Sequence, residues 1–354
     1  PDKGWAISSA DHREDMSLIK EIGANGIRLA HYPHSDEFYT LCDREGMLVW
    51  AEIPLVGKAL DTPEFTENMK TELTELIRQN FNHPSIFCWS LCNELSKGDV
   101  KGLISELNSV SHREDPGRLT VLAANVEKRP ENAVPDIMAF NTYPGWYWAE
   151  PSEMKSTLER WNRQCGNKGI AVSEYGAGAN VWHHWQTGKK TPKADGVFHP
   201  EEWQATVHEQ TYDAIKRSGF AWGSFVWNMF DFASASRNEG DMPGMNDKGL
   251  VSYDRKIRKD AFYFYQSEWS EEPVVHIASR RDVARRDSLT DVKVYTNCET
   301  VRLKVNGKDC GSPERNGSIC IWRKVGLKHG ENQVEAFGHR GGQEFSDRCK
   351  WVLF

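Results

Sequence analysis

Two glutamates in this chain stand at positions where a carboxylate has to be used or hydrogen-bonded. Glu94 closes the apolar run in WSLCNELSKG (89–98), and Glu174 closes the one in AVSEYGAG (171–178). Burying an ionised carboxylate without a partner is unfavourable, so a structural, hydrogen-bonded acid explains either residue alone. Together on one rim they would provide what glycoside hydrolysis needs. One carboxyl group protonates the leaving oxygen, and the other attacks or activates water.

The segments that must position these glutamates alternate in character along the chain. Seven apolar, strand-like runs occupy residues 25–31, 48–53, 85–94, 119–125, 137–143, 169–176 and 223–232. Helical patterns lie between them at residues 10–23, 62–81, 98–113, 151–165 and 200–219. Continuous apolar strands separated by helices predict a parallel sheet that is covered on both faces. Polar residues gather at the carboxyl ends of these strands, which form the working rim of a (β/α)8 TIM barrel.

Residues 1–270 therefore predict an α/β fold, a TIM barrel, but closure needs eight strands and the sequence supplies seven. We expect the first strand to lie upstream of Pro1, outside this chain, with the gap filled by those earlier residues or by a partner segment. An open gap would expose two parallel edges that invite pairing with another chain. A doubly wound open sheet is the alternative, but no glycine-rich phosphate loop follows the first strand.

The period of the hydrophobic pattern changes after about residue 270. Alternation in period two, typical of strands with one buried face, marks the segments 290–297, 300–307, 318–327, 331–338 and 347–354. Turn signals between them include Asn306-Gly307 and Gly341-Gly342. Residues 271–354 therefore predict a small, immunoglobulin-like β-sandwich.

Composition argues against several classes of partner. The 354 residues carry a formal net charge of −7 without a dense Lys/Arg run, which makes nucleic acid an improbable ligand. No apolar stretch approaches the roughly 18 residues of a membrane span. The eight cysteines form no CxxC pair, which disfavours a disulfide or metal site. The sequence leaves compartment and homo-oligomerisation open.

Four segments resemble signatures of glycoside hydrolase family 2, which includes β-galactosidases, β-glucuronidases and β-mannosidases. The first signature is similar to NGIRLAHYPHSDEFYTLCDREGMLVWAEIP (25–54), and the second to NHPSIFCWSLCNE (82–94). The nucleophile segment is similar to SEYG (173–176), and the last barrel strand to FVWNMFDF (225–232). The resemblance covers residues 1 to about 270 and, more loosely, the sandwich. It implies that sandwich domains and a first barrel strand precede the matched part.

The resemblance assigns chemistry to individual residues. Glu94 is implied as the general acid/base, and Glu174 as the nucleophile of a retaining mechanism with a covalent glycosyl-enzyme intermediate. Asn93 would hydrogen-bond the sugar 2-hydroxyl group, and Tyr143 would hold the carboxylate of the nucleophile. Because two close carboxyl groups disfavour double ionisation, the resting site should keep one proton, on Glu94.

Three further residues are implied as parts of the sugar pocket. Arg28 and His31 would line its floor, and Trp227 would form its wall. A structural salt bridge across the barrel explains Arg28 as well as sugar contact does. Core packing is the alternative for Trp227.

The identity of the carbohydrate substrate depends on a short motif. In β-glucuronidases an Asn-x-Lys at the place of Asn246 and Lys248 binds the sugar carboxylate, for which lysine is a natural counter-ion. Similar runs occur in β-galactosidases, and a β-galactosidase is the sequence-based expectation, with a β-glucuronidase or an inactive barrel fragment as alternatives. Glu52 is followed by Ile53 and Pro54, so the magnesium pair of large bacterial β-galactosidases is not supported. No metal or cofactor is expected.

Overall fold

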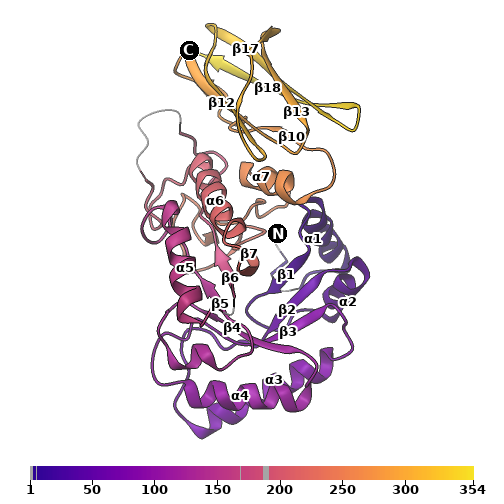
Figure 1. The fold of residues 1–354 in the computed structure, drawn as a ribbon, viewed down its shortest axis with the longest axis vertical. Helices are drawn as coiled ribbons and strands as arrows, with labels where there is room; N and C mark the ends of the chain where they lie inside the picture. The colour runs from indigo at the N-terminus through magenta and orange to yellow at the C-terminus, as the bar shows by residue number, and fades with distance from the viewer. Residues whose placement is uncertain (1–2, 5, 168, 186–190) are drawn as a thin grey trace.

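The chain folds into a helix-covered parallel sheet followed by an all-β part (Figure 1). The computed structural model describes residues 3–4, 6–167, 169–185 and 191–354. In Figure 1 the parallel sheet lies below, in indigo to pink, and the β part lies above it, in orange and yellow. Helix α7, drawn in orange, connects the two.

The parallel sheet contains seven strands whose order in space is their order in the chain. They are β1 (Gly26–Leu29), β2 (Leu48–Glu52), β3 (Ile86–Asn93), β4 (Leu119–Ala124), β5 (Ala139–Asn141), β6 (Ile170–Tyr175) and β7 (Ala221–Val226). A short antiparallel ribbon follows, formed by β8 (Phe232–Ala233) and β9 (Met245–Asn246). All seven predicted runs form strands, in the sequential order of a TIM barrel.

Helices between the strands cover the outside of the sheet. They are α1 (Ser9–Glu21), α2 (Asp36–Glu45), α3 (Pro63–Asn80), α4 (Lys101–Glu114), α5 (Met154–Gln164), α6 (Glu201–Lys216) and α7 (Asp260–Trp269), with the 3-10 turns η1 (Pro130–Ala133) and η2 (Pro151–Glu153). The five predicted helices are present, but the sequence analysis missed α2 and α7. Both have only ten residues. Helix α7 is buried over most of its surface, so its sequence lacks the polar face of an amphipathic helix.

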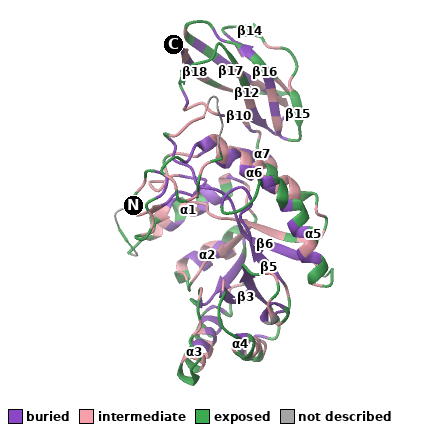
Figure 2. Cartoon of the chain, turned by 90° about the vertical axis from the view of Figure 1, so that its left-hand side faces the viewer, coloured by how far each residue is buried: buried purple, intermediate pink, exposed green. Residues whose placement is uncertain are grey.

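The barrel is not closed, because β1 and β7 form the two edges of its sheet. Strands β2 to β6 are almost entirely buried, whereas β1 and β7 are only partly buried; Figure 2 shows β3, β5 and β6 mainly in purple. The two edge strands approach each other without pairing, and a cavity of about 620 Å³ beside them is lined by both strands and by Ile19, Tyr212 and Trp269. The count of seven strands is confirmed. The expected eighth strand stays a prediction, and this cavity is where it would lie.

Beyond α7 the chain forms two mainly antiparallel sheets that face each other. One sheet has the order β10 (Val275–Ile277), β12 (Leu289–Thr296), β16 (Ile319–Gly326), β15 (Glu314–Asn316), and the other β11 (Ala284–Arg285), β18 (Gln343–Leu353), β17 (Gly330–Arg340), β13 (Thr300–Val305), β14 (Lys308–Asp309). A shared core that includes Val294, Leu303 and Trp322 lies between them. Asn306 and Gly307 turn the chain with φ of +52° and +77°, as a two-residue hairpin turn requires. The predicted sandwich is thus present.

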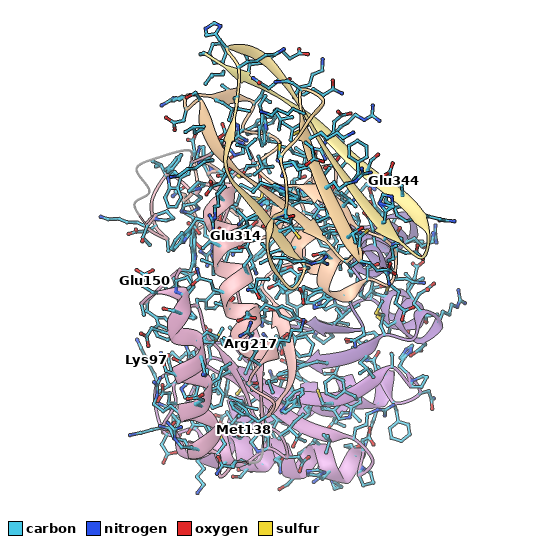
Figure 3. All side chains as sticks on the ribbon, turned by 45° about the horizontal axis from the view of Figure 1, so that its top comes forward. Lys97, Met138, Glu150, Arg217, Glu314 and Glu344 are labelled. Atoms are coloured by element: carbon cyan, nitrogen blue, oxygen red, sulfur yellow. The ribbon has the colours of Figure 1, made fainter. Side chains whose placement is uncertain are left out.

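The surface carries charges of both signs. Figure 3 labels exposed side chains from distant parts of the chain, namely Lys97, Glu150, Arg217, Glu314 and Glu344. No helix in the described ranges is long and apolar enough to cross a membrane.

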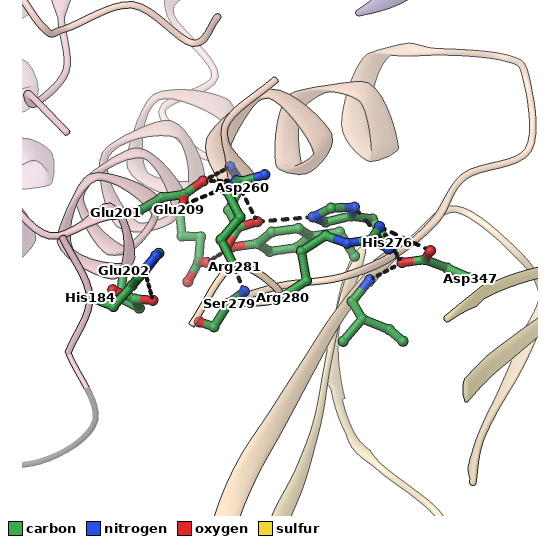
Figure 4. Close-up of polar contacts among 12 residues, drawn as sticks. His184, Glu201, Glu202, Glu209, Asp260, His276, Ser279, Arg280, Arg281 and Asp347 are labelled. Atoms are coloured by element: carbon green, nitrogen blue, oxygen red, sulfur yellow. Dashed lines mark hydrogen bonds and ion pairs between the residues drawn. The ribbon is translucent and has the colours of Figure 1, made fainter. Parts of the chain in front are cut away.

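A buried polar cluster joins α6 and α7 to the sandwich (Figure 4). Asp260 begins α7, and its Oδ1 lies 2.9 Å from Nε2 of His276 on β10. Arg281 contacts both Asp260 and Glu201, the first residue of α6. Burial and the charge of Asp260 raise the pKa of Glu201 to about 7. Burial opposes ionisation of Asp260 as well, but His276 and Arg281 outweigh it and lower its pKa to about 2.

Candidate active site

Glu174 faces the interior of the barrel at the carboxyl end of β6. Side chains alternate along a strand, so Glu174 and its neighbour Tyr175 point to opposite sides. The hydroxyl of Tyr175 bonds to that of Tyr265 on α7, outside the sheet. The carboxylate of Glu174 therefore points inward, where only 5% of the residue is exposed.

Two donors fix this carboxylate, one on each oxygen. Arg28 Nη1 donates to Oε1 of Glu174 at 2.7 Å, and the hydroxyl of Tyr143 donates to Oε2 at 2.5 Å. Burial and the charge of Glu174 raise the pKa of Tyr143 well above its usual value, so its hydroxyl keeps the proton that it donates. Tyr143 thus makes the contact that the sequence predicted.

Arg28 connects β1 to three other strands. It donates to both carboxylate oxygens of Glu52 on β2, each at 3.0 Å, and to Asn93 Oδ1 on β3 at 2.8 Å. On β6 it reaches the carbonyl oxygen of Ser173 as well as Glu174. Its side chain is 3% exposed, so the structure shows the salt bridge across the barrel that was the alternative to sugar contact. Through this bridge Arg28 holds the nucleophile candidate in place.

Glu52 belongs to the site, although the sequence analysis gave it no role beyond its place at a strand end and did not support a metal pair there. Its carboxylate lies 2.7 Å from His31 Nδ1 and accepts a hydrogen bond from Trp50 Nε1 at 3.0 Å. Burial opposes its ionisation, but Arg28 and His31 outweigh burial and lower its pKa. Its position at a strand end was visible in the sequence. Its partners Arg28 and His31 were not, because they come from β1 and the segment that follows it.

Trp227 and His31 form a stacked pair beside the carboxylates. Their ring centres are 5.0 Å apart with an angle of 15° between the planes, and His31 Nε2 lies 3.8 Å from Glu174 Oε1. Trp227 is partly buried and also packs edge-on against Phe232. It therefore contributes to packing and leaves part of its ring beside the site.

Glu94 follows β3 in the left-handed region, with φ of +54°, which is uncommon for a residue other than glycine. Its N–H bonds to the carbonyl of Ala123, and its Oε1 accepts a hydrogen bond from Asn141 Nδ2 at 2.9 Å. Burial, together with the charge of Glu174, raises the pKa of Glu94. This direction suits a group that has to hold a proton for a leaving oxygen.

Asn141 connects the two halves of the site, and the sequence analysis missed it. Besides Glu94, its Nδ2 contacts Asn93 Oδ1 at 3.0 Å, and its Oδ1 accepts from Ser173 Oγ at 2.7 Å. A signal was available. Asn141 stands two residues before Tyr143, and such positions share one face of an extended chain.

Lys248 lies among aromatic side chains that include Trp146 and Tyr147. It is 1% exposed, and its Nζ has no hydrogen-bond partner among the described residues. Nζ is 5.1 Å from the ring centre of Tyr147, which packs edge-on against Tyr143 with centres 5.1 Å apart. Asn246 Oδ1 accepts from the Lys248 N–H at 3.1 Å and so shapes the turn that carries the lysine. The rings of Tyr147 and Tyr143 therefore connect the ammonium group to Glu174.

The arrangement can perform acid-assisted displacement at a sugar carbon. One carboxyl group has a raised pKa, as proton donation to the leaving oxygen requires. The other is fixed by two donors, as a nucleophile must be. Within the described ranges, no group of three or more His, Cys, Asp or Glu side chains is arranged to hold a metal ion.

Comparison with known proteins decides the family. The profile of the TIM barrel domain of glycosyl hydrolases family 2 matches residues 1–271. The chain belongs to glycoside hydrolase family 2. The family expected from the sequence is thereby confirmed, and with it the TIM-barrel fold. A second profile, for a domain of unknown function, matches residues 287–346.

Individual members of family 2 resemble the chain over nearly its whole length. A β-glucuronidase from Bacteroides fragilis is 43% identical over 342 residues, which are 94% of this chain and 49% of that protein. A solved structure from Bacteroides fragilis, provisionally named a β-galactosidase, has a TM-score of 0.93 and 34% identity, covering 98% of this chain and 52% of its own.

A third comparison includes a bound ligand. The structure of Bacteroides uniformis β-glucuronidase 2, covalently bound to cyclophellitol-6-carboxylate aziridine, has a TM-score of 0.86 and 29% identity, with 99% and 44% coverage. The chain therefore spans about half the length of the family 2 proteins that it matches.

Proposed function

We propose that the chain forms the catalytic part of a retaining β-D-glucuronidase, which removes terminal glucuronic acid through a covalent glycosyl-enzyme intermediate. The observation that carries the proposal is Lys248, a buried lysine whose ammonium group has no hydrogen-bond partner in the described part of the chain. A buried charge without a partner is unfavourable, whereas a bound carboxylate would supply the missing counter-ion.

The proposal replaces the galactoside expected from the sequence. A galactoside presents a neutral hydroxymethyl group where a glucuronide presents a carboxylate, and only the carboxylate can pair with Lys248. The names of two of the three relatives support the same choice, since both are β-glucuronidases. The third carries the provisional galactosidase name.

The mechanism assigns one role to each carboxyl group. Glu94 donates its proton to the glycosidic oxygen while Glu174 attacks the anomeric carbon, and the aglycone leaves. Glu94 then takes a proton from water, which hydrolyses the ester on Glu174 and restores the resting site. Arg28 and Tyr143 hold Glu174 through both displacements, and in this proposal Asn93 hydrogen-bonds the sugar 2-hydroxyl group, the role that the family resemblance implies.

The test compares nitrophenyl β-glucuronide with nitrophenyl β-galactoside, and replaces Lys248 by Met. Removing one partner of a buried, hydrogen-bonded charge pair costs about 2–5 kcal/mol, so kcat/KM for the glucuronide should fall about 30- to 5,000-fold. Lys256→Met is the control, because Lys256 is exposed eight residues further on. It should leave the kinetics unchanged.

Reaction with cyclophellitol-6-carboxylate aziridine provides a second readout that requires one chemical step only. Intact mass should show one label per chain, lost in Glu174→Gln. A chain that neither cleaves the glucuronide nor takes the label, or that prefers the galactoside, refutes the proposal. The first of these outcomes would favour the inactive fragment.

A further inference from the structure

Between Asn246 and Lys248 stands an aspartate that the proposed mechanism does not use. Asp247 is completely buried, and its Oδ2 lies 2.6 Å from Nδ1 of His199, which is also completely buried. His199 precedes α6 and therefore comes from a different connection of the barrel. Burial opposes ionisation of Asp247, but the contact with His199 outweighs it and lowers the pKa of Asp247.

The Asp247 carboxylate fits against the backbone of two loops. A Cβ atom on Gly178 would lie 2.2 Å from its Oδ1, and one on Gly240 would lie 2.3 Å from its Oδ2. Only glycine leaves room at these two positions. The close approach fixes the side chain of Asp247 from both sides, in addition to His199.

The backbone at Asp247 is held just as firmly. Its carbonyl oxygen accepts the N–H of Ala179 at 3.0 Å and the Nζ of Lys259 at 2.9 Å. The N–H of Gly240 donates to the carbonyl of Gly196 at 2.8 Å, so the two connections are also bonded to each other. These hydrogen bonds thus fix the backbone of the turn that carries Lys248.

The indole of Trp146 contacts both His199 and Lys248. The imidazole of His199 meets the indole edge-on, with centres 4.7 Å apart at 75°. The Nζ of Lys248 lies 5.6 Å from the centre of the same indole. His199 is therefore connected to the ammonium group by two routes. One is its contact with Asp247, the residue before Lys248 in the turn, and the other is its contact with Trp146, whose ring lies beside the ammonium group.

We infer that the His199–Asp247 pair is the positioning element that aims Lys248 at the substrate carboxylate, and that it sets the preference for acidic over neutral sugars. The inference rests on the proposed function and deepens it. Neither residue contacts Glu94 or Glu174 in the described structure, so the pair should affect recognition of the acid group rather than the displacement.

The experiment measures selectivity at one position of the sugar. Nitrophenyl β-glucuronide and nitrophenyl β-glucoside differ only in carrying a carboxylate or a hydroxymethyl group. Their kcat/KM ratio is measured for the wild type, Asp247→Asn, His199→Leu and Lys248→Met. The ratio of labelling rates for cyclophellitol-6-carboxylate aziridine and its hydroxymethyl analogue gives the same information without turnover.

Asp247→Asn and His199→Leu should lower both ratios at least tenfold, through a higher KM for the glucuronide and with kcat for the glucoside within twofold. His199→Asn should restore most of the ratio, because its amide can donate from the place of Nδ1. In a Lys248→Met background, Asp247→Asn should change the ratio less than twofold, since a residue that acts through the lysine has no effect without it.

The possible outcomes distinguish this inference from the proposed function on which it rests. If Lys248→Met abolishes selectivity while Asp247→Asn keeps it, or if Asp247→Asn slows both substrates alike, the inference is wrong and the proposed function stands. If the wild type shows no preference for the acid, the proposed function fails first. Should Asp247→Asn not fold in a thermal melt, the comparison of His199→Leu with His199→Asn decides.

Discussion

Replacing Tyr143 by Phe removes one oxygen atom from the site and isolates the contribution of one hydrogen bond to catalysis. The hydroxyl donates to Glu174 Oε2 at 2.5 Å, while Arg28 continues to hold Oε1. A hydrogen bond to a charged group contributes about 1.5–3 kcal/mol. Without it the carboxylate can rotate about its remaining donor, so the reactive orientation loses that much free energy. The value of kcat/KM should fall about 10- to 150-fold, since 1.4 kcal/mol is tenfold.

The assay is steady-state hydrolysis of a nitrophenyl glycoside, together with a thermal melt. Tyr175→Phe is the matched control, because Tyr175 is the next residue to Glu174, is fully buried and loses its hydroxyl contacts with Tyr265 and Ser224. Both variants should lose similar stability, of order 1 kcal/mol, but only Tyr143→Phe should lose activity. A Tyr143→Phe enzyme within twofold of the wild type, or an equal loss in Tyr175→Phe, would refute the reasoning.

Three further predictions concern the two active-site glutamates and the buried Glu201. A retaining mechanism requires the carboxyl groups of Glu94 and Glu174 to lie about 5–5.5 Å apart, and NMR should show the β-anomer as the first product; the α-anomer contradicts it. Because the pKa of Glu94 is raised, kcat/KM should fall as pH rises through that pKa. Glu94→Ala should lose this basic limb yet still cleave dinitrophenyl glycosides, which need little protonation, and an unmoved limb counts against the assignment. The pKa of Glu201 is raised from 4.5 to about 7, so the folded state keeps a proton that the unfolded chain releases above about pH 4.5. Unfolding free energy should therefore decline as pH rises between these values, and Glu201→Gln should flatten that decline in thermal melts; an unchanged slope would show that another group is responsible.

The strands of the barrel could be predicted because their information is local. A continuous apolar run such as 169–176 is visible in the sequence, and β6 (Ile170–Tyr175) lies inside it. The two glutamates were found for the same reason, since each ends such a run. The position of a side chain relative to its own strand follows from alternation alone.

The partners of these side chains could not be predicted, because they depend on how separate strands align. Arg28 stands opposite Trp50 in the β1–β2 register, and this places it beside Glu52. The pairing of His199 with Asp247 depends on two loops of irregular conformation, 48 residues apart. No periodicity records such a contact. The sequence led to a galactoside and the proposed function to a glucuronide for a related reason, since the motif showed a lysine but not its burial or its lack of a hydrogen-bond partner among the described residues.

Arg28 stands on an edge strand of the open barrel, so the fraction of molecules with a complete active site depends on how often that strand opens. Strand β1 pairs with β2 over only four residues and has no hydrogen-bonded strand on its other side among the described residues, so it is expected to open locally more readily than the central strands. Each such opening withdraws Arg28 from Glu174 and gives a folded but inactive molecule. Whatever occupies the cavity beside β1 and β7 binds the closed form preferentially, and by linkage it raises the competent fraction. Turnover would then respond to an occupant that never touches the sugar.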